Sequence, residues 1–265
     1  MLEAILLPVI SIGGLSVIFG ALLGFSAKRF SVKTDPKVEN IKEALPGTNC
    51  GSCGFPGCAV FAEAVTKEQV NYNGCAPGGN STAQKIAETL GIDPTVSARK
   101  VAFIKCDGKE DNVKRNYIYD GPKNCIAASQ LATGGNKTCS YSCIGLESCK
   151  NACLFDAIIM TGGIAQVDSQ KCTACGKCII ACPKNLIEIV PDKYKVRVLC
   201  NSHDIGRFVR RNCRAGCTGC GLCCRACPVQ AIKVIDNVAH IDYSICISCL
   251  SCSDACPAKT IKIVK

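Results

Sequence analysis

The sequence predicts an α+β chain that joins an N-terminal transmembrane helix, a small helical domain and two tandem modules of short helices and hairpins. Three observations lead to this prediction. Ala4 to Ala27 carries no charged residue, the following stretch alternates helix-forming runs with Gly- and Pro-rich loops, and the remainder repeats a cysteine pattern between short alternating segments. We expect the parts to be 1–27 (anchor), 28–35 (linker), 36–95, 100–212 and 213–265.

The cysteine content argues against a disulfide-stapled secreted protein. The chain has 265 residues and 25 of them are cysteine, a density that in a short secreted chain would indicate a disulfide scaffold. This chain is too long for that class, and its cysteine count is odd. Many neighbouring cysteines are separated by two residues, a spacing that lets several thiolates converge on one metal centre. The sequence therefore favours metal clusters.

The formal charge of +10 would suggest a nucleic-acid partner, but it counts every cysteine as a neutral thiol. A cubane of four irons and four sulfides held by four thiolates carries about −2 when it is oxidised. Six such clusters would bring the loaded protein to a net charge of about −2. The basic excess is then counter-charge for the clusters, so we expect no nucleic acid among the partners.

The uncharged N-terminal stretch predicts a single membrane span. Its 24 residues would form a helix of about 36 Å, against about 30 Å for a bilayer core. A cleaved signal peptide is the alternative, but such peptides begin with basic residues, whereas here Lys28 and Arg29 follow the apolar run. By the positive-inside rule we expect the N-terminus outside a bacterial cytoplasmic membrane and the remaining chain in the cytoplasm.

Three cysteines of the 36–95 segment share a loop that is rich in glycine and proline, and a fourth follows a helix predicted over 59–70. Such a loop can wrap its backbone closely around a cluster. The predicted ligands of this first centre are Cys50, Cys53, Cys58 and Cys75. Zinc is the alternative, because four cysteines can hold a structural zinc ion. The spacing of two, four and sixteen intervening residues is not the paired spacing of zinc sites.

The C-terminal part contains the pattern C-x2-C-x2-C-x3-C-P twice, which is the signature of bacterial ferredoxins with two [4Fe–4S] clusters. In that pattern three cysteines of a tight loop hold one cluster, and the fourth crosses to the other cluster. We therefore expect a ferredoxin-like module over 213–265. Its predicted ligand sets are Cys217, Cys220, Cys223 and Cys256 for one cluster, and Cys246, Cys249, Cys252 and Cys227 for the other.

A less regular copy of the same arrangement precedes it and predicts a first ferredoxin-like module over 100–212. Its second half keeps the pattern, whereas its first half has three, five and three intervening residues and Leu154 in place of the proline. Both copies have 18 residues between the two halves, with hairpins predicted around Gly162-Gly163 and Asp236-Asn237. The predicted sets are Cys139, Cys143, Cys149 and Cys182, whose irregular spacing leaves the ligation open, and Cys172, Cys175, Cys178 and Cys153.

Five sets of four leave five cysteines. Cys224 stands beside a ligand already assigned and is expected to be spare. The other four bracket the first module, and because the ends of a compact module lie close together, they predict a sixth cluster that ties the modules to one another. These cysteines are Cys106, Cys125, Cys200 and Cys213. Four unrelated buried thiols, which behave as small apolar side chains, are the alternative.

The motifs indicate electron transfer and no substrate-converting site on this chain. There is no G-x-G-x-x-G after a strand, no Walker A, no G-x-S-x-G and no H-E-x-x-H. Two histidines are too few for a metal–histidine site. Clusters whose irons are all held by cysteine carry single electrons and leave no iron open for a substrate.

A run of four arginines stands immediately before the last module, at Arg207, Arg210, Arg211 and Arg214. One interpretation is a docking patch for an acidic soluble ferredoxin, because complementary charge raises the rate of encounter. The alternative is counter-charge for nearby clusters or a solvated helix face.

The uncharged N-terminal span, the loop from Leu45 to Cys58 and the tandem cysteine modules together resemble the B subunit of the Rnf complex, an ion-translocating ferredoxin:NAD⁺ oxidoreductase of bacterial membranes. The loop alone also resembles part of corrinoid iron–sulfur proteins. The Rnf resemblance covers essentially the whole chain. It implies that the protein takes electrons from reduced ferredoxin and relays them through five or six [4Fe–4S] clusters to the membrane subunits of the complex, which couple the flow to Na⁺ or H⁺ movement.

Two other functions stay open from the sequence. One is a polyferredoxin subunit of another membrane redox complex, against which the leading domain with Cys50 and Cys75 argues. The other is a zinc-rich structural or nucleic-acid-binding protein, against which the Cys-Pro motifs and the scarcity of histidine argue.

Overall fold

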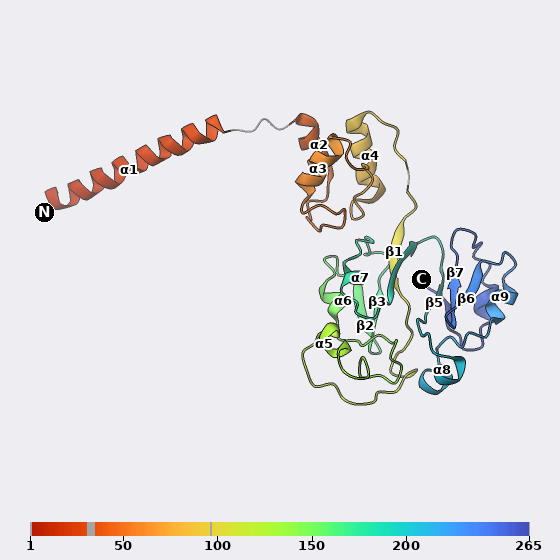
Figure 1. Cartoon of the computed structure of the whole chain (residues 1–265). Helices are drawn as coiled ribbons and strands as arrows, with labels where there is room; N and C mark the ends of the chain where they lie inside the picture. Colours follow the sequence, from red (N-terminus) through yellow and green to blue (C-terminus); the bar gives the residue numbers. More distant parts are fainter. Residues whose placement is uncertain (1, 31–34, 96, 265) are drawn as a thin grey trace.

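A computed structural model describes residues 2–30, 35–95 and 97–264 of the chain, and the side chains from residue 12 onward (Figure 1). The N-terminal helix α1 (Leu2–Arg29) projects away from the other elements. Of the predicted linker at 28–35, residues 31–34 lie outside the described residues. The remaining elements form a small helical domain followed by two similar α+β modules.

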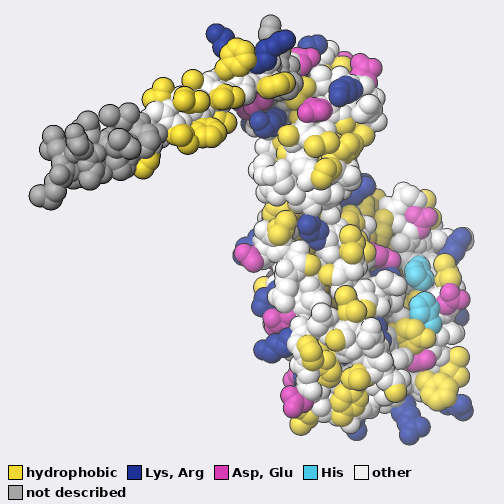
Figure 2. All heavy atoms as spheres, turned by 60° about the vertical axis from the view of Figure 1, so that its left-hand side comes forward, with side chains coloured by type: hydrophobic (Ala, Val, Ile, Leu, Met, Phe, Trp, Pro, Cys, Tyr) yellow, Lys and Arg dark blue, Asp and Glu magenta, His cyan; other side chains and the backbone are white. Residues whose placement is uncertain are grey.

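Helix α1 has the length and composition of a membrane span. Its segment Ile12–Arg29 has a mean hydropathy of 1.2, and none of that segment is buried within the structure. Figure 2 shows apolar side chains along the described part of this helix, from residue 12 onward, whereas charged side chains are spread over the helical domain and the modules. A signal sequence near an N-terminus has the same length and composition, so these properties make α1 a candidate span.

The helical domain consists of α2 (Pro36–Ala44), α3 (Cys58–Thr66) and α4 (Gly79–Leu90). The Asp35 carboxylate caps α2 by accepting a hydrogen bond of 2.9 Å from the Lys37 backbone N–H. Ile41, Phe61 and Ile86, one from each helix, are at most 1% exposed and form the centre of the core. This core supports the loop between α2 and α3 that carries three of the predicted ligands.

Helix α3 ends earlier than the sequence predicts. The prediction ran to residue 70, but the helix stops at Thr66. Glu68 adopts a left-handed backbone with φ of 56°, a conformation that an α-helix cannot continue. The Lys67 and Glu68 N–H groups still donate to carbonyls of the last helical turn, so the chain leaves the helix without unpaired donors.

The first module contains two antiparallel strand pairs. Strand β1 (Lys100–Ile104) pairs with β4 (Ile187–Pro191), and β2 (Ile158–Thr161) forms a hairpin with β3 (Ile164–Val167). The hairpin turns at Gly162-Gly163, as predicted, and both glycines have positive φ (59° and 75°). Three short helices carry cysteines over the sheets: α5 (Cys125–Ser129), α6 (Ser148–Asn151) and α7 (Lys177–Ile180).

The second module repeats this plan. Strand β5 (Val196–Val198) pairs with β8 (Ile261–Ile263), and β6 (Ile232–Ile235) forms a hairpin with β7 (Val238–Ile241) through Asp236-Asn237, again as predicted. Its helices are α8 (Gly206–Asn212), α9 (Leu222–Ala226) and α10 (Ser251–Asp254). Strand β5 lies before residue 213, where the second module was predicted to begin. Its partner is β8, which follows the last cysteines of that module, so β5 is part of the second module's sheet.

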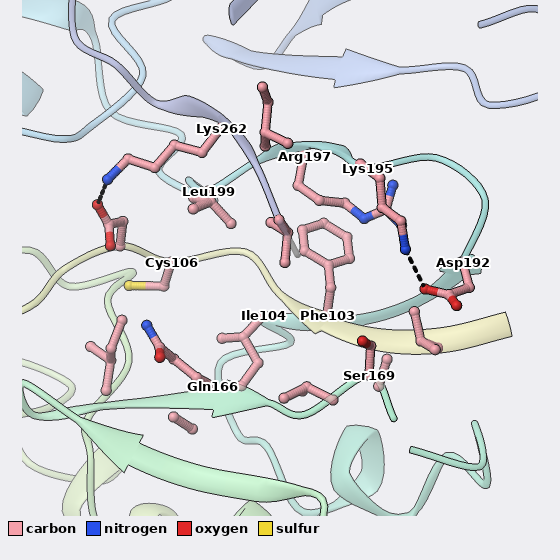
Figure 3. A pocket seen from close by; sticks show the side chains of 18 of the residues that line it. Phe103, Ile104, Cys106, Gln166, Ser169, Asp192, Lys195, Arg197, Leu199 and Lys262 are labelled. Atoms are coloured by element: carbon pink, nitrogen blue, oxygen red, sulfur yellow. Dashed lines mark hydrogen bonds and ion pairs between the residues drawn. The ribbon is translucent and has the colours of Figure 1, made fainter. Parts of the chain in front are cut away.

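The two modules meet along a seam that contains a buried arginine. Arg197 of β5 is 3% exposed, and Figure 3 shows it beside Phe103 of β1. Its guanidinium carbon lies 5.6 Å from the centroid of the Phe103 ring and 5.0 Å from that of the Tyr243 ring. The guanidinium donates hydrogen bonds of 3.1 Å to the Pro191 and Val196 carbonyls. Arg197 therefore joins strands of both modules through cation–π contacts and hydrogen bonds.

Farther along the seam an ion pair links the two modules. The Lys262 ammonium of β8 lies 2.6 Å from the carboxylate of Asp107, which is 5% exposed. Asp107 also donates its backbone N–H to the Leu199 carbonyl at 3.1 Å. Between this ion pair and Arg197 runs an open groove lined by both modules (Figure 3).

Replacing the buried arginine by an apolar residue of similar length is expected to destabilise the modules. In Arg197→Met the Pro191 and Val196 carbonyls lose their charged donor, which costs roughly 2 kcal/mol. That corresponds to a fall of about 4–8 °C in the midpoint of thermal unfolding, measured by circular dichroism on the anaerobic, cluster-loaded chain. The exposed Arg225→Met is the matched control and should change stability by less than about 0.5 kcal/mol. Equal shifts in the two variants would contradict the role of the seam.

Candidate metal centres

All 25 cysteines are free thiols, and most of them gather in groups drawn from loops and short helices. In the helical domain, Cys50, Cys53 and Cys58 lie on the loop before α3, and all three raise the pKa of Cys75 electrostatically, although burial is the larger cause. Because charge acts in this way only over short distances, the four predicted ligands of the first centre lie together. The Ser52 hydroxyl lies 3.1 Å from the Cys50 Sγ.

The side chain of Asn49 fixes the shape of this first loop. Its Oδ1 accepts a hydrogen bond of 2.8 Å from the Cys58 N–H, and its Nδ2 donates to the Gly47 carbonyl at 3.2 Å. Asn49 itself has a positive φ of 47°, as do Gly51 and Gly54 at 73° and 87°. The cysteine spacing did not indicate Asn49. The signal available in the sequence was an asparagine, a residue that tolerates left-handed backbone, in a loop of glycines.

Two cavities of the second module are each lined by four cysteines from both halves of its repeat. One contains Cys217, Cys220, Cys223 and Cys256, and the other contains Cys227, Cys246, Cys249 and Cys252. These are the two crossed sets expected from the spacing. Backbone N–H groups point at the crossing sulfurs: that of Ala231 donates to the Cys227 Sγ at 3.2 Å, and that of Thr260 to the Cys256 Sγ at 3.3 Å.

The regular half of the first module shows the same arrangement. Burial is the main cause that raises the pKa of Cys178 to about 11, and the nearby Cys172, Cys175 and Cys153 contribute to this rise, so this predicted set also lies together. The Ala157 N–H donates to the Cys153 Sγ at 3.4 Å, at the position that corresponds to Ala231 in the second module. Thr173, between two of these cysteines, has a buried hydroxyl with no hydrogen-bond partner among the described residues, which fits a sulfide-rich group beside it.

The irregular half differs from the grouping expected from the spacing. Burial, together with neighbouring thiols that include Cys143, Cys125 and Cys182, raises the pKa of Cys149 to about 12. Cys139, which the spacing grouped with Cys149, instead lines another cavity. Cys125 reaches Cys149 because its N–H donates to the Ser148 hydroxyl at 2.8 Å, which joins α5 to α6.

The cavity that contains Cys139 also contains three cysteines left over from the regular pattern, and its full cysteine lining is Cys106, Cys139, Cys200 and Cys213. Burial raises the pKa of Cys106 to about 12 and that of Cys200 to about 11. Of the four residues predicted to hold a sixth cluster, the structure therefore brings three together and places Cys125 elsewhere.

Burial and mutual repulsion favour the protonated thiol at the most buried cysteines of these groups. Burial is the main cause that raises the pKa of Cys149 and Cys223 to about 12, and neighbouring thiols add to it. Metal binding replaces those protons, so cluster loading is coupled to proton release and to folding. The cysteine groups thus fit a group that carries several positive metal ions.

A single metal ion and a cubane require different separations between their four sulfurs. One zinc ion with Zn–S bonds of about 2.3 Å would draw its thiolates to within about 4 Å of one another. Within the part of the chain that the structure describes, no three His, Cys, Asp or Glu side chains converge in the way a single metal ion requires. A cubane is wider than one ion and holds its thiolates farther apart.

The predicted arginine patch lies on α8 and immediately after it. Arg207, Arg210, Arg211 and Arg214 are all exposed, and Arg207 packs over the Phe208 ring at 5.4 Å from its centroid. The same helix contributes Val209 and Asn212 to the cavity that contains Cys213. A strongly basic surface therefore covers one of the cysteine groups.

Three family models match the chain at the positions of these groups. A model that describes an Fe-S cluster matches residues 45–77, a 4Fe-4S binding domain matches 164–187, and a 4Fe-4S dicluster domain matches 216–260. The matches cover the helical domain's cysteine loop, the regular half of the first module and most of the second module.

Curated relatives extend the likeness over most of the chain. The B subunit of the Na(+)-translocating ferredoxin:NAD(+) oxidoreductase complex of Acetobacterium woodii is 42% identical over 93% of this chain and 74% of its own length. The B subunit of the ion-translocating oxidoreductase complex of Methanosarcina acetivorans is 37% identical over 89% of both chains. The proton-translocating counterpart of Clostridium ljungdahlii is 40% identical over 91% of this chain and 84% of its own. The chain therefore belongs to the family of B subunits of the ion-translocating oxidoreductase (Rnf) complex, an electron-transfer family built on 4Fe-4S domains.

Proposed function

We propose that this chain accepts electrons from reduced ferredoxin and relays them to the membrane subunits of an ion-translocating ferredoxin:NAD⁺ oxidoreductase. The observation that carries the proposal is the pair of cavities in the second module, each lined by four cysteines from both halves of the repeat. The names of the relatives in Acetobacterium woodii and Clostridium ljungdahlii support the same reaction. When bound in such cavities, [4Fe–4S] clusters supply carriers of single electrons.

Four cluster sites follow from the cysteine groups, and a fifth is centred on Cys143, Cys149 and Cys182. The proposed ligands of the four are Cys50, Cys53, Cys58 and Cys75; Cys153, Cys172, Cys175 and Cys178; Cys217, Cys220, Cys223 and Cys256; and Cys227, Cys246, Cys249 and Cys252. Cys224 lies against Cys223 and remains spare. The pairing of β5 with β8 supports a second module that begins at β5.

The chain's own groups tune how easily these sites take up an electron. N–H groups of Ala157, Ala231 and Thr260 donate to the crossing cysteine sulfurs at 3.2–3.4 Å. Hydrogen bonds to sulfur stabilise the added negative charge of the reduced state and raise the reduction potential. The burial of Cys178, Cys223 and Cys252 keeps water away from the sulfurs and acts in the opposite direction. The N–H donors and the burial of the sulfurs together then tune the reduction potential of each site.

The reduction of NAD⁺ takes place on another subunit in this proposal, because it needs two electrons and a proton at one site. The chain contains no nicotinamide-binding motif. The groove at the seam, which is lined by Phe103, Arg197 and Lys262 among others, is therefore not assigned to NAD⁺ in this proposal. Helix α1 anchors the chain in the bacterial cytoplasmic membrane, with its basic end at Lys28 and Arg29 and the modules on the cytoplasmic side.

The first experiment tests the relay on the full chain, purified anaerobically in detergent. Iron, zinc and acid-labile sulfide are counted, and the chain is titrated with reduced ferredoxin while its visible absorption is followed. We expect about 20 or more irons per chain and bleaching of the brown colour upon mixing. Zinc in place of iron, with no bleaching, would overturn the proposed function together with every cluster site.

The second experiment tests whether ferredoxin docks on the arginine patch of α8. Replacement of Arg207, Arg210, Arg211 and Arg214 by Gln is expected to lower the rate of reduction by ferredoxin about tenfold at low salt, because steering by charge is lost. The dependence of that rate on ionic strength should also flatten, as measured by stopped-flow absorption.

A matched control removes the same charge elsewhere on the surface, by replacing the exposed Lys85, Lys114, Lys123 and Lys233 with Gln. This control should leave most of the salt dependence in place. If both variants flatten it equally, the patch serves only as counter-charge and ferredoxin docks at another surface.

A further inference from the structure

We propose that the chain holds a sixth [4Fe–4S] cluster at the boundary between the two modules, and that the ligands differ by one exchange from those the spacing suggests. In this proposal Cys139 joins the sixth cluster and Cys125 takes its place in the neighbouring one. The two ligand sets are Cys106, Cys139, Cys200 and Cys213 for the sixth cluster, and Cys125, Cys143, Cys149 and Cys182 for its neighbour. A role of this cluster in electron relay rests on the proposed function. The assignment of its ligands does not, because it is argued from the positions of the cysteines alone.

Hydrogen bonds to the backbone bring the four segments of the sixth site together. The Asp107 N–H donates to the Leu199 carbonyl at 3.1 Å, which sets Cys106 beside Cys200. Cys213 pairs with Val113 in an isolated β-bridge. The Thr138 hydroxyl donates to the Asn212 carbonyl at 3.1 Å, which holds Cys139 against the end of α8. These bonds join distant parts of the chain and define one cavity with a cysteine on each segment.

The space in this cavity matches that of the two regular cluster cavities. The unfilled space, open solvent at its mouth included, amounts to about 400 Å³, against about 360 Å³ around Cys217 and about 330 Å³ around Cys246 measured in the same way. Two glycines line it: a Cβ on Gly108 would lie 3.1 Å from the Cys106 Sγ, and a Cβ on Gly216 would clash with a Val209 methyl. Glycine at these two positions therefore avoids steric clashes with neighbouring atoms of the cavity lining.

Sulfur in this cavity also receives the kind of hydrogen bond seen at the regular sites. The N–H groups of Gly108 and Cys143 both donate to the Cys106 Sγ at 3.3 Å, and the Ser202 N–H donates to the Cys200 Sγ at 3.5 Å. A neutral thiol needs no such pair of donors, whereas a thiolate that shares the negative charge of a cluster is stabilised by them.

A buried cation lies between the sixth site and its neighbour. Lys137 is 3% exposed, and its ammonium donates to the Gly108 and Gly163 carbonyls at 2.9 and 2.8 Å. Cys143 of one set and Cys106 of the other are among its electrostatic neighbours. Burying an ammonium is costly unless negative charge offsets it. An anionic cluster on each side supplies that charge.

With Cys125 and Cys139 exchanged, each set of four contains only cysteines that lie near one another. Cys139 has Cys213 as an electrostatic neighbour, and Cys200 has Cys139. Cys125 is instead an electrostatic neighbour of both Cys143 and Cys149. Six sets of four then account for every cysteine of the chain except Cys224.

The test begins with iron and sulfide per chain in the native, full-length protein, where about 24 of each are expected. A count of about 20, with normal bleaching by ferredoxin, would overturn the sixth cluster and leave the proposed function standing. This measurement needs no variant, so it holds even if a cysteine replacement prevents folding.

Variants then test which cysteines share a cluster. The double variant Cys139→Ala/Cys200→Ala should lose about four irons. The quadruple variant that also carries Cys106→Ala and Cys213→Ala should lose no further iron, because all four residues hold the same cluster. Mössbauer and EPR spectra should show the other five clusters unchanged, with no [3Fe–4S] signal. Cys224→Ala is the control and should keep about 24 irons.

A second pair tests the neighbouring cluster in the same way. Cys125→Ala/Cys149→Ala should also lose about four irons, and the two double variants combined should lose about eight. If Cys139→Ala/Cys149→Ala loses only four irons while Cys139→Ala/Cys200→Ala damages two clusters, the exchange is wrong and the ligands follow the spacing.

Discussion

Thiolates packed in groups of four repel one another, and the rest of this structure depends on how that repulsion is offset. Burial already raises the pKa of Cys149 and Cys223 to about 12, so these side chains cannot ionise without metal ions at the centre of each group. The bound clusters then leave a negative charge, which N–H donors, the buried Lys137 and a formal excess of ten positive charges counterbalance. Because metal binding is coupled to folding, bound clusters would add cohesion to modules that are built from short loops and two-stranded sheets.

The regular parts of the fold could be predicted from sequence because their determinants are local. The two C-terminal cysteine runs, the hairpins at Gly162-Gly163 and Asp236-Asn237, and the helical character of residues 36–95 each depend on residues close together in the chain. The crossing of Cys227 and Cys256 is long-range, but it follows from a repeat whose topology is fixed.

The remainder depends on contacts between distant segments, which spacing does not encode. Three-residue strands such as β5 carry too little pattern to reveal a partner about 65 residues away. Cys125 and Cys139 stand on either side of an irregular loop, and it is the hydrogen bond from Cys125 to Ser148 that brings Cys125 toward Cys149. Arg197 looks like a surface residue in the sequence, and its burial arises from two rings contributed by different modules.

The pairing of β5 with β8 also bears on how the protein is assembled during synthesis. Strand β8 spans Ile261–Ile263, so the outer sheet of the second module cannot form until that stretch has left the ribosome. The helical domain contains all four of its own cysteines by residue 75 and can close around its metal much earlier. Vectorial folding during synthesis thus lets the protein mature in order, from the helical domain to the second module.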